Sequence, residues 1–174
     1  MTAQTLDATS LDTSPPPPAA GDTQNTNGMS SAAAAVAYAG ALPLIAGAIL
    51  GWARPEDLGP MVLGWMAIYG VALLGFFGGV RWGIAVMQPA GPTFPQLLGA
   101  VVPLMLAVAV FPLEGVVTQL AVLTLAIPIL LIDDLRATRR GAGPPAWYLG
   151  VRVPLTVMME LAFLAALLLG LRVL

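Results

Sequence analysis

Long apolar runs, separated by short polar or proline-containing turns, dominate the chain from residue 32 onwards. The runs lie near residues 32–52, 61–87, 94–111, 116–132 and 149–173. Each approaches the roughly 20 residues that an α-helix needs to cross a hydrocarbon core of about 30 Å. None shows the alternation of a barrel strand, and only helices and closed barrels satisfy the backbone inside lipid. The pattern predicts an all-α, polytopic transmembrane helix bundle over residues 31–174, with five spans.

The third and fourth runs leave one alternative open. Both are short, and only Pro112-Leu113-Glu114-Gly115 separates them. If they form a re-entrant hairpin, three full spans remain.

Three prolines fall inside the apolar runs, at Pro43, Pro103 and Pro128. Neighbouring helices of a membrane bundle can satisfy the carbonyls that a proline leaves free. We therefore expect helices with kinks near these positions.

Residues 1–30 form a polar tail of different composition. They include the proline run Pro15 to Pro18, three aspartates, no basic residue and almost no large apolar residue. Such a segment cannot bury enough surface to offset its ordering entropy, so we expect it to be disordered. Its acids and its lack of a positive start argue against both a signal peptide and a transit peptide.

Composition supports a lipid-facing exterior. The chain has 174 residues, of which 58% are hydrophobic and 9% charged, whereas soluble domains carry about 25% charged residues. The lipid bilayer is therefore an expected partner. The absence of Cys and His excludes thiol chemistry, disulfides and the usual zinc and haem ligands, so no cofactor or metal is expected. The few basic residues are scattered arginines, which does not suggest nucleic-acid binding.

The arginines also predict an orientation. With five spans, the tail, the 88–93 loop and the 133–148 loop share one side of the membrane. That side collects the following arginines: Arg81, Arg136, Arg139, Arg140 and Arg152. The other side has only Arg54 and Arg172. The bias predicts a cytoplasmic N-terminus and an external C-terminus.

Glycines at four-residue spacing mark candidate packing faces. Gly75, Gly79 and Gly83 form what we call the glycine row, and Gly47 and Gly51 repeat the spacing in the first run. Small residues at this spacing allow two helix backbones to approach closely. The row could pack within the bundle, or it could form the face for a homo-oligomer or a partner subunit.

Two charged residues lie deep inside apolar runs. Arg81 is roughly 9 Å from the end of its run, and Glu160 roughly 16 Å into the last one, at 1.5 Å per residue. Arg81 could snorkel to the interface or form an ion pair. Glu160 is too short to snorkel, so it must be protonated, paired or placed in a polar cavity. We expect Arg81 and Glu160 to pair or to share one cavity.

Other charged residues lie nearer to the predicted interface. Arg152 follows the aromatic pair Trp147-Tyr148 and precedes Pro154, which is typical of an anchored helix start. Asp133-Asp134, followed by three arginines, is interpreted as part of a solvated loop. A lipid-headgroup site and a hard-cation site are the alternatives there.

Two motifs carry a resemblance to a known family. They are Tyr69-Gly70 with Phe76-Phe77-Gly78-Gly79-Val80-Arg81-Trp82-Gly83, and Trp147-Tyr148 with Arg152 and Leu155-Thr156. Over residues 32–174 the chain resembles the bacterial relatives of transmembrane protein 69, known as domain of unknown function 3429. It departs from the family pattern at Val71, Gly75, Phe77 and Val151. The resemblance implies a multi-pass protein of undefined activity in the inner (cytoplasmic) membrane of a bacterium, and it supplies neither a substrate nor a catalytic residue.

These observations leave three classes of function open. The first is an accessory or assembly component of a larger membrane complex, favoured by small size and glycine-rich helix faces. The alternative is a small transporter or channel that acts as an oligomer, with Arg81 and Glu160 along its path, although no internal repeat is visible. The third is a membrane enzyme, for which no spacing of residues assembles a catalytic site.

Overall fold

The computed structural model describes residues 31–141, 143–144 and 146–173. The tail over residues 1–30, expected to be disordered, lies outside the described residues. The described part contains six helices and no strand, which confirms the all-α prediction. They are α1 (Ser31–Ala39), α2 (Leu42–Ala53), α3 (Gly59–Val86), α4 (Phe94–Val110), α5 (Val116–Arg139) and α6 (Ala146–Val173).

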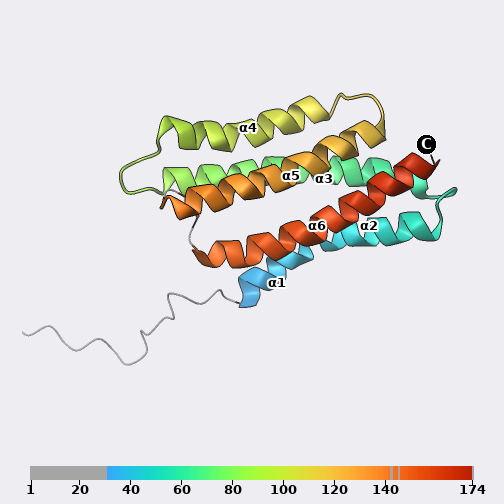
Figure 1. Ribbon diagram of the computed structural model, residues 1–174, viewed down its shortest axis with the longest axis horizontal. Helices are drawn as coiled ribbons and strands as arrows, with labels where there is room; N and C mark the ends of the chain where they lie inside the picture. Colours follow the sequence, from blue (N-terminus) through green and yellow to red (C-terminus); the bar gives the residue numbers. More distant parts are fainter. Residues whose placement is uncertain (1–30, 142, 145, 174) are drawn as a thin grey trace, which may run out of the picture.

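α1 leads into α2 in the same direction, and the helices from α2 to α6 run alternately in opposite directions (Figure 1). Four helical stretches are long and apolar enough to cross a bilayer: Ala34–Ala53, Gly59–Val86, Val116–Arg139 and Trp147–Val173. The shorter apolar helix α4 has 17 residues, which is the lower end of the length range for a spanning helix. The molecule is therefore a helical membrane bundle of about five spans.

The first apolar run is broken into two helices. α1 ends at Ala39, and α2 begins at Leu42 with Pro43 in its first turn, where a proline needs no hydrogen-bond partner. The Tyr69 hydroxyl donates a hydrogen bond of 2.8 Å to the Gly40 carbonyl, so α3 satisfies a group that the break exposes. A helix break replaces the kink expected at Pro43.

Two boundaries differ from the predicted ones. α5 continues through Asp133 to Arg139, so the aspartate pair is helical instead of part of a loop. α6 begins at Ala146, which places Pro154 inside the helix and not in its first turn.

α3 is the central helix, since it contacts α2, α4, α5 and α6. The core between these helices is apolar, and it includes the buried side chains of Leu63, Met66, Leu123, Ile127 and Phe163. The outer faces are apolar as well, with large exposed side chains such as those of Phe76, Leu125 and Leu168. A water-facing surface would not carry so many exposed apolar side chains, which agrees with a surface in contact with lipid.

Close helix packing occurs where glycines face a neighbouring helix. A Cβ on Gly78 would lie 2.7 Å from the Ala100 carbonyl oxygen, so α3 and α4 touch backbone to backbone. A Cβ on Gly70 would lie 2.6 Å from Leu123 of α5. Small residues therefore set the distance from α3 to both neighbours.

Candidate functional site

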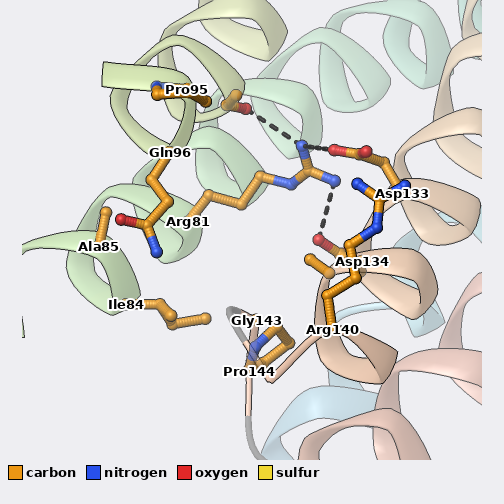
Figure 2. Close-up of a pocket in the computed structure, with 12 residues that line it drawn as sticks. Arg81, Ile84, Ala85, Pro95, Gln96, Asp133, Asp134, Arg140, Gly143 and Pro144 are labelled. Atoms are coloured by element: carbon orange, nitrogen blue, oxygen red, sulfur yellow. Dashed lines mark hydrogen bonds and ion pairs between the residues drawn. The ribbon is translucent and has the colours of Figure 1, made fainter. Parts of the chain in front are cut away.

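Arg81, near the end of α3, is the first residue of a buried charge network. Its Nη1 donates to a carboxylate oxygen of Asp133 at 2.9 Å and to the Gly99 carbonyl at 3.1 Å. Its Nη2 lies 2.8 Å from the Leu130 carbonyl and 2.8 Å from Asp134 Oδ1. Figure 2 shows the guanidinium turned toward α5. Its side chain is only 13% exposed, so Arg81 is held by these groups and does not snorkel.

Asp134 connects the two buried arginines of the network. Its Oδ1 binds Arg81, and its Oδ2 lies 3.5 Å from Arg152 Nε. Its side chain is 8% exposed, against 60% for the adjacent Asp133. Successive helical residues point about 100° apart, so α5 directs one carboxylate into the bundle and the other toward its surface. The charge network thus consists of Arg81, Asp133, Asp134 and Arg152.

Arg152, in the second turn of α6, is the most deeply buried member. Its side chain is 1% exposed, and its guanidinium carbon lies 3.4 Å from the centre of the Phe77 ring, a cation–π contact. Its three guanidinium nitrogens have no hydrogen-bond partner among the described residues, because the contact with Asp134 is an ion pair without hydrogen-bond geometry. The expected anchored helix start is thus a buried cation with unused donors.

The expected pair of Arg81 and Glu160 is wrong. The ion-pair partners of Arg81 are the two aspartates of α5, whereas Glu160 Oε1 is buried without a partner in the described chain. The Thr156 hydroxyl is also buried and unpartnered. Arg152, Thr156 and Glu160 follow one another at four-residue steps, so α6 carries a polar ladder on successive turns.

Two cavities adjoin the network. The smaller, of about 210 Å³, lies beside Arg81 and the aspartates, with walls from α3, α4 and α5 (Figure 2). The larger, of about 570 Å³, lies between α1, α3 and α6, and Arg152 is on its wall. Glu160 lines neither cavity, so it does not share one with Arg81.

The spaced glycines of the first run and those of the glycine row differ in what they contact. A Cβ on Gly47 would lie 3.0 Å from Met66, and one on Gly51 would lie 2.7 Å from Leu169, so both face neighbouring helices. A Cβ on Gly79 or Gly83 would meet no described atom within 4 Å. The glycine row therefore does not pack inside the chain, apart from an ordinary 3.9 Å contact at Gly75.

The central position of Asp134 and the packing role of Gly78 were not predicted from the sequence. A signal for Asp134 was present. In a five-span topology, the end of the second run and the end of the fourth meet at one side of the membrane, which brings Arg81 near Asp133 and Asp134. This proximity was not predicted, because charged residues directly after an apolar run were interpreted as a solvated loop.

Comparisons with known proteins agree with this architecture. The family described as "Protein of unknown function (DUF3429)" matches residues 29–168. Transmembrane protein 69 of Xenopus tropicalis is 33% identical over 102 residues. That match covers 57% of this chain and only 39% of the frog protein. No solved structure matches the chain. Since the family covers both motifs and all four members of the charge network, the chain belongs to the DUF3429 family of membrane proteins.

Proposed function

We propose that this protein is an accessory or assembly component of a larger membrane complex, and that the outer face of α3 binds a partner helix. The observation that carries the proposal is the open glycine row, at Gly79 and Gly83 above all. The face also presents the exposed side chains of Phe76 and Trp82.

A glycine in a helix needs a reason, because it is about 1 kcal/mol less favourable there than alanine. At Gly70 and Gly78 the reason is close contact with another helix of the same chain. At Gly79 and Gly83 the part of the chain that the structure describes supplies no such contact. A partner helix in the membrane would supply it, since close backbone approach gains van der Waals contact that lipid does not match.

The chemistry of the chain fits a non-catalytic role. Without Cys and His, an enzyme would have to use carboxylates, hydroxyls or arginines. Asp133 and Asp134 bind guanidinium groups. These properties support a membrane component that acts through contact with other proteins. We propose that it lies in the inner membrane of a bacterium, and the arginine bias supports a cytoplasmic N-terminus of the chain.

Purification from native membranes in mild detergent, followed by mass spectrometry, tests the proposal. We expect a partner at fixed stoichiometry with the wild-type chain. Gly79→Leu should reduce the partner yield about tenfold, because its side chain separates the two helices. Gly64→Leu is the matched control, since Gly64 is on the same helix, also faces open space and lies outside the row. Equal yields from both variants would contradict the proposed face.

A small transporter or channel that acts as an oligomer is the second candidate. The polar ladder of α6 favours it, because unpartnered polar groups inside a membrane protein commonly mark a pathway. The same purification separates the two proposals. A homo-oligomer without any other subunit would favour transport, which ion or solute flux into proteoliposomes would then measure for the wild type and for Glu160→Gln.

A further inference from the structure

The larger cavity has the size and lining of a ligand site. Its volume of about 570 Å³ falls within the roughly 300–1,000 Å³ typical of small-molecule sites. Most of its wall is apolar, with side chains that include Val36, Leu73, Phe76, Phe77, Leu155 and Met159. Val36 and Phe76 are largely exposed on the outer surface, so the cavity opens toward the lipid side of the bundle.

The two arginines of the charge network differ in how well the described chain satisfies them. Arg81 has both aspartates as ion-pair partners, and both of its terminal nitrogens bind groups of α4 or α5. Among the described residues, Arg152 has only the 3.5 Å ion pair with Asp134. Arg152 is on the cavity wall with both terminal nitrogens unpartnered in the described chain. An anionic group at the wall would accept these unused donors, and the guanidinium fork binds phosphate or carboxylate with two parallel hydrogen bonds.

The cavity wall has a polar end and an apolar side, which correspond to the headgroup and the acyl chain of a lipid. Tyr148 lines the cavity together with Arg152. It follows Trp147 in an aromatic pair typical of the membrane interface. Arg152 lies four residues further along α6, about 6 Å deeper. α1 contacts α2 and α6 but makes no close backbone contact with α3, which leaves the side between α1 and α3 for an apolar chain.

We infer that this cavity binds one anionic lipid of the surrounding bilayer. The headgroup phosphate lies at the Arg152 guanidinium, and an acyl chain lies along the apolar wall between α1 and α3. Apolar contacts alone would admit any lipid, so the charge of Arg152 selects the anionic class.

Native mass spectrometry of the purified full chain tests the inference. The protein is equilibrated with equal amounts of phosphatidylglycerol and phosphatidylcholine that carry the same acyl chains. We expect one tightly bound phosphatidylglycerol in the wild type. Arg152→Gln should reduce the preference for phosphatidylglycerol about tenfold, since charged hydrogen bonds to the headgroup are lost. Arg140→Gln, which removes an exposed arginine at the same end of the bundle, should leave the preference unchanged.

Val80→Trp provides a test that keeps the charge network. Val80 lines the cavity, so an indole there should fill it and lower the retention of phosphatidylglycerol, even if Arg152→Gln does not fold. Thermal melting shows which variants are folded. Equal retention of the two lipids by the wild type would overturn the inference. So would a preference that persists in a folded Arg152→Gln or Val80→Trp protein, or one that Arg140→Gln abolishes.

Discussion

At the scale of single residues, Asp134 is the carboxylate that compensates the charge of both buried arginines. It binds Arg81 at 2.8 Å and lies 3.5 Å from Arg152. Removing one member of a buried ion pair typically costs about 3–5 kcal/mol, because the partner charge stays buried without compensation. Loss of this carboxylate would leave Arg152 without an ion-pair partner among the described residues and Arg81 with Asp133 alone.

Asp134→Asn should therefore lower the melting temperature of the detergent-solubilised protein strongly, or reduce the yield of folded protein. Asp133→Asn is the matched control. Its carboxylate is 60% exposed, and exposed ion pairs contribute only about 0–1 kcal/mol. Thermal melting followed by gel filtration measures both variants. Similar melting temperatures for the two would contradict the central position of Asp134.

The sequence predicted part of this site. The depth of Arg81 in its apolar run, which is visible in the sequence, marked it as a candidate, whereas Arg152 was expected only at an anchored helix start. The partner of Arg81 was not identified, because several acids can reach one arginine and only the packing of helices decides among them. Glu160 was preferred on depth alone, whereas α5 contacts α3 directly and presents Asp134 to it.

At the scale of helices, two adjacent glycines of α3 face different surroundings. Gly78 faces the backbone of α4, and Gly79 faces outward. One step along a helix turns a residue by about 100°, which accounts for the difference.

Gly78→Leu should destabilise the bundle, because its side chain would displace the Ala100 carbonyl and therefore the α4 backbone. We expect a loss of about 2 kcal/mol or more, within the range for overpacked cores. Gly79→Leu should leave the melting temperature of the isolated chain unchanged or slightly raised, because leucine is the better helix former. Thermal melting of the two proteins without partners measures this. A larger loss for Gly79→Leu would show that the outward face of α3 is wrongly assigned.

Helices were predicted better than their ends. Four of the five apolar runs each correspond to one helix, and the first is divided between α1 and α2. The agreement follows because a segment in lipid must satisfy its own backbone hydrogen bonds. The extension of α5 to Arg139 was missed, since charged residues there suggested a loop. The two aspartates of this extension instead form ion pairs with Arg81, and Asp134 also pairs with Arg152. The break before Pro43 depends on the hydrogen bond from Tyr69, a tertiary contact that local sequence does not reveal.

At the scale of the whole molecule, a bundle of about five membrane spans accounts for the positions of the charge network and of the outer face of α3. The spans bring the end of α3, the end of α5 and the start of α6 to one face of the membrane, where the charge network lies (Figure 1). They leave the outer face of α3 to lipid or a partner. The crossing by α4 matters most, because its 17 residues make it the shortest spanning segment.

The membrane topology is therefore the most direct test. Alkaline phosphatase, which is active only outside the cytoplasm, is fused after residues 91, 114 and 140 and at the C-terminus. Five crossings with a cytoplasmic N-terminus predict activity after residue 114 and at the C-terminus, and none after residues 91 and 140. Inactivity after residues 91 and 114 together with activity after residue 140 would show that α4 does not cross. Activity after residues 91 and 140, with none after residue 114 or at the C-terminus, would show the reverse of the proposed orientation.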